Sequence, residues 1–454
     1  MCLQSGRVVG VLVGFFLLLG ISQTYFPADL VLAAPDISNL RPMKGIAYEP
    51  APSDDFQLQT PPFNEFNAVY YDTDFYNTDF AALWGADGRN DLLTMKNAGI
   101  NFLHIYNWNP ARNHTPFLDA VNANGMKVMI PISNYTNCLI VGNCQGVNVG
   151  SYQNAFTNIQ NIFNQIYPGG STAPHPAAAM WGIYNEYDKN TVDPVNVAFV
   201  VQALIKLEND RGVPVANRLP ITVPVSFATR TAAEFAKFGE QQPPFFQAAE
   251  QLYKQIKPAL DVPGGVLAQM ALYTAFERAQ QQGTTTYGGV PVAAMPADFW
   301  TARYLASVNP FETGLVTKEY ITDANQFQSV FPGNTAWNVL PPLFYTEMGI
   351  NIGGANPPTA DGQAAWVLGQ IRCTHPLAIN PASTTQGYFF GSNIFMLPNE
   401  AKQGSWGLFI FTGPNDFVTR KTTSGQDYRQ DTLKPQPVWN SVIAGYQATQ
   451  LQCP

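Results

Sequence analysis

The chain is short of charge. Lys, Arg, Asp and Glu together make up 12% of its 454 residues, about half the usual share. The net charge is −8 and no cluster of Lys or Arg occurs, which argues against a nucleic-acid partner, because such partners require basic side chains. Uncharged polar residues must therefore cover much of the surface, a composition common in exported proteins.

The motifs of several large enzyme classes are also missing. Only four histidines occur, with no HExxH motif and no paired Cys-x-x-Cys, so we expect neither a catalytic metal nor a cofactor. There is no Walker loop, no GxGxxG behind a strand and no GxSxG elbow. These absences argue against kinases, dehydrogenases and α/β-hydrolases.

A hydrophobic run near the N-terminus is typical of an export signal. Arg7 is followed by apolar or glycine residues at 8–21, a run too short to span a membrane. Small residues end this region, which predicts a signal peptide over 1–33 cleaved after Ala33, with an uncleaved anchor as the alternative. We expect a secreted, cell-surface or periplasmic monomer that has no membrane span after signal removal and forms one domain over 34–454.

Cysteine is scarce, with five residues in all, four of them beyond the predicted signal. An even number in an exported chain suggests two disulfides, for which three pairings are possible. We favour Cys138–Cys144, which closes a short loop, and Cys373–Cys453, which ties down the C-terminus.

Strand-like and helix-like segments alternate through most of the chain. Strands are predicted at 43–48, 100–106, 126–132, 178–184 and 221–226, within 299–308, and at 339–346 and 387–394. Helices are predicted at 89–98, 116–124, 152–166, 195–210 and 438–447. This alternation predicts an α/β (β/α)8 TIM barrel with long loops and an inserted helical segment around 230–295.

Two apolar strings each lead to a glutamate. One is Trp181–Glu186, and the other lies in Pro342–Gly349 and leads to Glu347. A carboxylate at the C-terminal end of a barrel strand faces the place where such barrels do chemistry. Two carboxylates flanking one bond are the requirement of glycoside hydrolysis, so we predict Glu186 and Glu347 as a catalytic pair. The alternative for each is a helix-capping or loop carboxylate.

Asn185 and Glu186 are adjacent, and an ideal strand would point them to opposite faces. Both can serve one site only if the strand breaks there. Further candidate substrate-binding residues are Tyr48, Tyr106 and Asn309, at predicted strand ends, and Glu400, in a predicted loop. For the first three the alternative is ordinary packing, and for Glu400 a loop charge.

Taken together, these motifs resemble the retaining (β/α)8 glycoside hydrolases, and within them the β-1,3-glucanase and β-1,3-glucanosyltransferase families 17 and 72. The segments that carry the resemblance are Lys44–Tyr48, Ala98–Tyr106, Asn113–His114, Phe117–Asp119, Asn185–Glu186, Asn309–Glu312, Thr346–Gly349, Glu400 and Trp406–Phe409. The resemblance implies that Glu186 is the acid/base and Glu347 the nucleophile of an enzyme acting on β-glucan. It also implies that Asn185 hydrogen-bonds the sugar 2-hydroxyl and that no metal is needed.

The chain departs from these families at two positions. His104 stands where they often carry Arg, and Phe311 where they often carry a Tyr that hydrogen-bonds the nucleophile. These losses motivate a second hypothesis, a non-catalytic carbohydrate-binding barrel. An endo-β-1,4-glucanase or mannanase is the alternative among enzymes, since that family shares both glutamate motifs.

Overall fold

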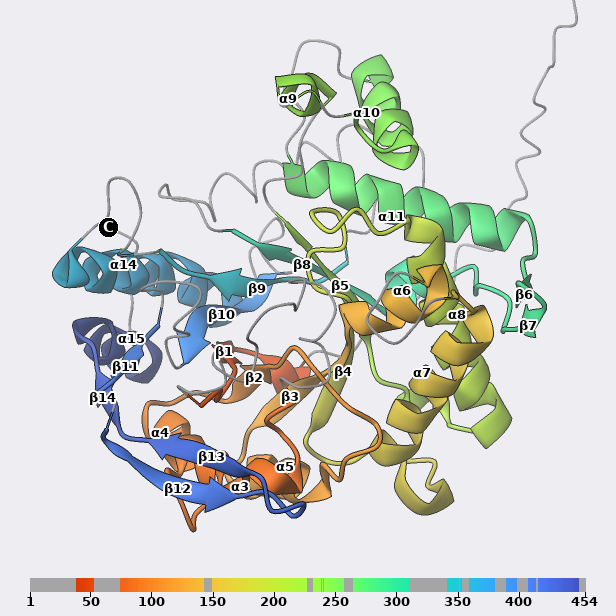
Figure 1. Ribbon diagram of the computed structural model, residues 1–454. Helices are drawn as coiled ribbons and strands as arrows, with labels where there is room; N and C mark the ends of the chain where they lie inside the picture. Colours follow the sequence, from red (N-terminus) through yellow and green to blue (C-terminus); the bar gives the residue numbers. More distant parts are fainter. Residues whose placement is uncertain are drawn as a thin grey trace, which may run out of the picture. The chain divides into compact units, whose positions relative to one another are not determined.

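Eight parallel strands close into a barrel (Figure 1). The computed structural model describes residues 38–52, 74–142, 149–226, 232–237, 239, 241–256, 264–310, 341–350, 352, 359–379, 389–397, 407–413 and 415–448. All of them belong to one compact unit. The predicted signal peptide, Phe311 and Glu400 lie outside the described residues.

The barrel strands run β1-β10-β9-β8-β5-β4-β3-β2 around the ring. Their bounds are β1 (Met43–Tyr48), β2 (Phe102–His104), β3 (Lys127–Ile132), β4 (Ala178–Ile183), β5 (Ile221–Ser226), β8 (Tyr304–Asn309), β9 (Leu343–Met348) and β10 (Phe389–Leu397). The predicted barrel is therefore confirmed. Some bounds differ from the prediction. The seventh barrel strand is Leu343–Met348 and includes Glu347, so this carboxyl is part of the strand rather than the residue after it. β2 is shorter than the predicted 100–106, and β10 runs beyond the predicted 394.

The strands read as apolar runs because both of their faces are covered. Every residue of β4, β5, β8 and β9 is buried. A cluster of buried side chains from several strands packs together, formed by Leu40, Met43, Phe102, Met129, Ala179, Met180, Leu305, Phe344 and Phe390. A parallel strand buried in this way has no solvent-facing side, so a polar residue at its end has to find partners or perform a function.

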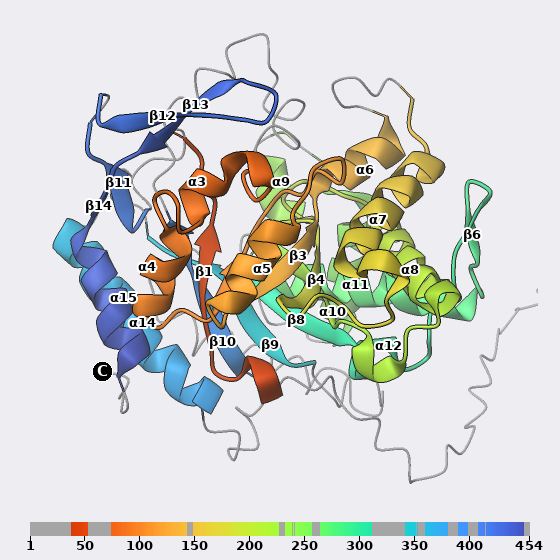
Figure 2. The same cartoon turned by 90° about the horizontal axis from the view of Figure 1, so that it is seen from below.

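Helices surround the barrel (Figures 1 and 2). Those at the predicted places are α4 (Asp91–Asn97), α5 (Thr115–Ala123), α7 (Tyr152–Ile166), α8 (Pro194–Arg211) and α15 (Pro437–Gln447). A long helix, α14 (Ala360–Ile379), lies beside α15 in both views. The short α6 (Asn134–Val141) follows β3 directly and was not predicted.

The segment between β5 and β8 contains the expected inserted helices. They are α9 (Ala232–Lys237), α10 (Pro244–Ile256) and α11 (Gly264–Gln281), followed by the small hairpin of β6 (Thr286–Tyr287) and β7 (Val290–Pro291). α9 and α10 lie on the far side of α11 from the barrel (Figure 1).

Near the C-terminus, β12 (Phe417–Lys421) and β13 (Asp427–Asp431) form a hairpin beside α3 (Ala81–Trp84), visible in both views (Figures 1 and 2). Thr423, at its turn, donates its backbone N–H to Asp79 Oδ1 at 2.8 Å, and the Tyr428 ring meets Phe80 at 5.0 Å. Within the described part of the chain, none of the helices has both the length and the apolar character needed to cross a membrane.

Candidate active site

The backbone breaks sharply where β4 ends. Tyr184 and Glu186 both adopt left-handed backbone angles, with φ of 54° and 49°, which a non-glycine residue rarely does. This break removes the strand alternation that would have sent Asn185 and Glu186 to opposite faces. Strain of this kind persists only when neighbouring groups hold it, and it occurs often at functional sites.

Asparagine side chains hold the broken segment in place. Asn134, just after β3, accepts the backbone N–H of Asn185 on Oδ1 at 3.0 Å and donates from Nδ2 to the Asn185 carbonyl at 3.2 Å. Asn190 donates to the carbonyls of Asn185 and Glu186 at 2.9 and 3.1 Å. The backbone groups that β4 leaves unpaired at its end are thus satisfied locally.

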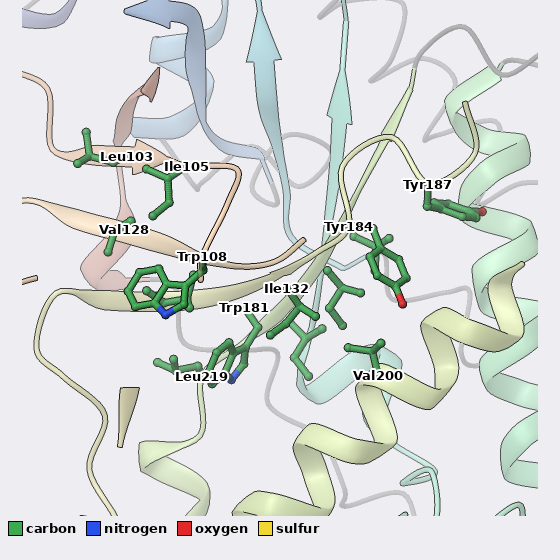
Figure 3. Close-up of a cluster of buried hydrophobic side chains, with 14 of the residues drawn as sticks. Leu103, Ile105, Trp108, Val128, Ile132, Trp181, Tyr184, Tyr187, Val200 and Leu219 are labelled. Atoms are coloured by element: carbon green, nitrogen blue, oxygen red, sulfur yellow. The ribbon is translucent and has the colours of Figure 1, made fainter. Parts of the chain in front are cut away.

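The next two side chains anchor the turn on its other side. The Tyr187 hydroxyl donates to the Ala268 carbonyl of α11 at 2.6 Å, and Figure 3 shows its ring lying against that helix. Asp188 accepts the backbone N–H of Ser226, at the end of β5, at 2.8 Å. These contacts fix the position of the Glu186 backbone relative to two neighbouring elements.

Asn309 ends β8 and reaches across to the end of β4. Its Nδ2 donates to Asn185 Oδ1 at 3.2 Å. Since Oδ1 of Asn185 is used in this way, the donor that Asn185 offers to Glu347 is its NH₂ group, and this interaction acts to lower the pKa of Glu347. Asn309 is 1% exposed, and its own Oδ1 has no partner among the described residues.

Glu347 is a buried carboxyl near the end of β9, 3% exposed. Burial first, and then the charge of Glu186, raises its pKa from 4.5 to about 8, against the opposing effects of Tyr106, Asn185 and Lys189. Its Oε1 has no hydrogen-bond partner among the described residues. The charge of Glu186 therefore acts on Glu347, in addition to the larger effect of burial.

His104, at the end of β2, lies beside Glu347 without neutralising it. Its Nδ1 is 3.9 Å from Glu347 Oε1 but 2.9 Å from the Thr346 carbonyl, to which it donates. Burial lowers the pKa of His104 to about 4, so the ring is neutral at physiological pH. The Arg that the resembling families carry here would be a permanent charge, and this chain lacks it.

Lys189 supplies a positive charge in contact with Glu186. Its Nζ is 2.8 Å from Glu186 Oε2, while its side chain is 65% exposed and that of Glu186 only 9%. Burial acts to lower the pKa of Lys189, but the carboxylates of Glu186 and Glu347 outweigh it and raise the pKa. The sequence signal for this residue is its position three places after Glu186.

The other three predicted site residues have three different outcomes. Tyr106 belongs to the site: burial and then the Glu347 charge raise the pKa of its hydroxyl, and its ring lies 4.5 Å from that of His104. Tyr48 is fully buried, and its hydroxyl donates to Asp91 at 3.0 Å, so its polar atom is used in packing beside α4. Glu400 lies outside the described residues.

Cys138 and Cys373 are each disulfide-bonded. Cys144 and Cys453 lie outside the described residues, so the pairings stay predictions. Across the described ranges, no group of three or more His, Cys, Asp or Glu side chains is placed to hold a metal ion.

Solved structures that are similar to this chain include several of one yeast protein. Saccharomyces cerevisiae Gas2p in complex with laminaripentaose is 13% identical, covering 91% of this chain and 69% of that one, with a TM-score of 0.45. A Gas2p variant with laminaritetraose and laminaripentaose has a TM-score of 0.44 at 13% identity, covering 91% of this chain and 66% of that one. No protein-family model matches, and no curated protein matches. This chain thus spans about two thirds of the length of the structures to which it is similar.

Proposed function

We propose that the protein is a retaining glycoside hydrolase or transglycosidase that acts on β-glucan, with β-1,3 linkages as its substrate. The observation that supports this most directly is the pairing of Glu186 and Glu347 at the C-terminal ends of β4 and β9, where the charge of one raises the pKa of the other. Two carboxyls that flank one bond, one as the acid and one as the nucleophile, are the chemical requirement of the reaction. The motif resemblance to the β-1,3-glucan families selects the substrate class.

In the proposed reaction Glu186 donates its proton to the glycosidic oxygen as the bond from that oxygen to the anomeric carbon breaks. The Glu347 carboxylate attacks the anomeric carbon and forms a glycosyl ester. In the second step water, or a hydroxyl of another sugar, attacks the same carbon and gives its proton to Glu186 while the ester bond to Glu347 breaks. Water yields hydrolysis and a sugar hydroxyl yields transfer.

The neighbours of the pair have defined tasks in this scheme. Asn185, oriented by Asn309, offers its NH₂ group next to Glu347, where the sugar 2-hydroxyl is expected to bind. The Tyr106 hydroxyl, which has no hydrogen-bond partner among the described residues, also acts on this carboxyl, and the NH₂ group and the hydroxyl both favour the charged form of Glu347.

The test is turnover of laminarin, cellulose and mannan oligosaccharides by the wild type, Glu186→Gln and Glu347→Gln, with products scored by length. We expect both variants to lose at least about a thousandfold in kcat on laminarin, because each removes a group that acts in the transition state. Asp210→Asn, an exposed carboxylate on α8 paired with Lys206, is the matched control and keeps full activity. Longer products would identify transfer, and preference for cellulose or mannan would replace the β-1,3 assignment.

Retention is tested separately by following the anomer that forms first with ¹H NMR. A retaining mechanism requires carboxyl groups about 5–5.5 Å apart and gives the β-anomer first. Release of the α-anomer would mean inversion and would remove Glu347 from the role of nucleophile.

A non-catalytic carbohydrate-binding barrel is the second candidate, because Glu347 faces a neutral His104 and burial favours its protonated form. In that case wild-type protein binds laminarin oligosaccharides and turns over none of the three glycans. Binding measured by calorimetry beside the turnover assay distinguishes the two.

We further propose that the protein works outside the cytoplasm, since Cys138 and Cys373 are disulfide-bonded and disulfides persist in oxidising compartments. Peptide mapping without reduction should recover Cys138 linked to Cys144 and Cys373 linked to Cys453. Free thiols in protein purified from its own host would contradict this location.

A further inference from the structure

The backbone just before Glu186 is bound by a side chain from a different element. Near the end of the β3–β4 ladder, the Tyr184 N–H donates to the Ile132 carbonyl at 2.8 Å. One residue further on, the Asn134 side chain takes over. Its Oδ1 accepts the Asn185 N–H at 3.0 Å, and its Nδ2 donates to the Asn185 carbonyl at 3.2 Å. A side-chain amide carries the same donor and acceptor as a peptide group, so Asn134 pairs with Asn185 as a neighbouring strand would.

The two partners fix the orientation of the Asn134 amide. A backbone N–H requires an acceptor and a backbone carbonyl requires a donor, so the amide cannot be turned over without losing both bonds. The Asn185 carbonyl belongs to the peptide bond that leads into Glu186. The NH₂ group of Asn134 therefore acts directly on the position of the Glu186 backbone.

The segment that Asn134 binds is strained. Tyr184 and Glu186 have φ of 54° and 49°, and each residue held in this region costs about 1–3 kcal/mol. On the side after Glu186, Tyr187 and Asp188 bind α11 and the end of β5, at 2.6 and 2.8 Å. On the side before it, Asn134 provides the matching attachment to the end of β3. Without Asn134 the strained angles can relax, and Glu186 moves with them.

The element that carries Asn134 is itself anchored. Asn134 is the first residue of α6, and two residues later Thr136 is fully buried, where its Oγ1 accepts Nδ2 of Asn158 on α7 at 3.1 Å. The side chain of Asn185, by contrast, is held from β8, by Asn309 at 3.2 Å. Loss of the Asn134 side chain therefore releases the peptide bond before Glu186, while the Asn185 amide keeps its own support.

We propose that Asn134 is a positioning residue for the general acid: it fixes the peptide bond before Glu186 and so sets how the Glu186 carboxyl reaches the glycosidic oxygen. The inference rests on the proposed function and adds to it a residue that touches neither the sugar nor the reacting atoms. Loss of Asn134 should impair the steps that use Glu186 and spare the attack by Glu347.

The test compares two substrates with different leaving groups. The leaving sugar of a laminarin oligosaccharide must be protonated, whereas the dinitrophenyl β-glycoside of laminaribiose releases a phenolate that needs no acid. The quantity measured is kcat/KM, which covers the steps up to the glycosyl ester. For Asn134→Ala it should fall about thirtyfold to a hundredfold on the oligosaccharides, because the acid is displaced, and less than about threefold on the dinitrophenyl glycoside.

The ratio of the two values, taken on one sample, does not depend on the folded fraction. Asn134→Asp keeps the acceptor for the Asn185 N–H and loses the donor to the Asn185 carbonyl, so it should show the same substrate difference as Asn134→Ala. Glu186→Gln should show it more strongly. An equal loss on both substrates in Asn134→Ala would overturn the proposal.

The second readout is the step in which Glu186 serves as base. Azide attacks the anomeric carbon of the glycosyl ester without a base, breaks the bond to Glu347 and gives a β-glycosyl azide. It should raise kcat of Asn134→Ala on the dinitrophenyl glycoside about tenfold, because water needs the base that is displaced. A general disturbance of the fold would not be relieved by azide, so absence of this rescue also counts against the proposal.

Asn158→Ala is the matched control, since it removes a buried hydrogen bond to the same helix on the side away from Asn185. It should keep the wild-type ratio of the two substrates and show no rescue by azide. If the wild type turns over neither substrate, the proposed function fails and the role of Asn134 fails with it. If the wild type is active and Glu186→Gln shows the substrate difference but Asn134→Ala does not, the Asn134 proposal alone fails.

Discussion

Asn309 Nδ2 donates to Asn185 Oδ1 at 3.2 Å, and this one bond decides which end of the Asn185 amide faces Glu347. Replacing Asn309 by Asp puts an acceptor opposite Oδ1, so we expect the Asn185 amide to turn and withdraw its NH₂ group from Glu347. Because the loss of one hydrogen bond to a charged group is involved, kcat/KM on laminarin should fall about tenfold to a hundredfold.

The matched control is Asn196→Asp. Asn196 on α8 makes a similar bond, from its Nδ2 to Asn137 Oδ1 at 3.0 Å, but lies outside the site. Thermal unfolding of both variants checks that each is folded at the assay temperature. Equal activity of Asn309→Asp and wild type would show that the amide orientation of Asn185 has no role.

The buried carboxyl of Glu347 should cost the protein stability at neutral pH. Its pKa is raised from 4.5 to about 8, so the folded state holds a proton that the unfolded state releases. Stability linked to this group is complete below about pH 4.5 and is lost as pH rises towards about 8. Glu347→Gln binds no such proton. Its free energy of unfolding, measured in urea, should therefore rise relative to that of the wild type across this range.

We expect the gain of Glu347→Gln to reach about 1–2 kcal/mol or more at the upper end of the range, as is common when an uncompensated buried charge is removed. Asp210→Asn, which changes an exposed carboxylate, should follow the wild type at every pH. A constant difference between Glu347→Gln and wild type from acid to alkaline pH would contradict the assignment of the raised pKa to Glu347.

The sequence predicted the barrel well because the barrel strands are buried on both faces and are therefore largely apolar. In β4 and in β9, for example, all six residues of each strand are buried. The two glutamates were visible for the same reason, since a charge that ends such a run is conspicuous. The carboxyl at position 347 could not be assigned to the strand itself, because nothing local distinguishes the last strand residue from the first loop residue.

The supporting residues were harder to find. The local sequence marks Asn134 only as the first residue of a glycosylation sequon, Asn134–Thr136, yet it holds the backbone of Asn185 with two hydrogen bonds across 51 positions. Tyr48 was predicted to bind substrate because it ends a strand, but its ring direction depends on Asp91, which the chain brings close only on folding. Such roles depend on long-range contacts that no local pattern contains.

Gly45 on β1 is predicted to tolerate no side chain. It pairs with Asn393 on β10, and a Cβ added to Gly45 would lie 1.7 Å from Asn393 Oδ1 and 3.2 Å from the Ser392 carbonyl. Asn393 cannot easily withdraw, because its Nδ2 donates to the Tyr345 carbonyl at 3.1 Å. Gly45→Ala should therefore cost about 1–3 kcal/mol of unfolding free energy, measured in urea.

Two comparisons make the Gly45 prediction specific. Gly369, inside α14, has open space where a Cβ would go, so Gly369→Ala should stabilise the protein by about 0.5–1 kcal/mol. The double variant Gly45→Ala with Asn393→Ala should recover part of the loss, because it removes the clashing atoms. If Gly45→Ala is as stable as the wild type, β1 and β10 do not approach each other as closely at Gly45 and Asn393 as described.

The last prediction concerns a buried ion pair at the other end of the barrel from the glutamates. Arg303, just before β8, donates from Nη1 to Glu208 Oε2 at 2.7 Å and from Nη2 to Oε1 at 2.6 Å and to the Leu219 carbonyl at 2.8 Å. The Glu208 side chain is fully buried. Arg303→Met would leave that carboxylate unpaired, which costs about 3–5 kcal/mol of unfolding free energy in urea.

The double variant with Arg303→Met and Glu208→Leu should regain most of this loss, because it removes the stranded charge together with its partner. The folded fraction of either variant should keep the wild-type pH profile on laminarin, since neither residue contacts Glu186 or Glu347 through any bond described above. A loss below about 1 kcal/mol in Arg303→Met would mean that Glu208 finds water or another donor, and that the pair is not what fixes α8 to the base of β8.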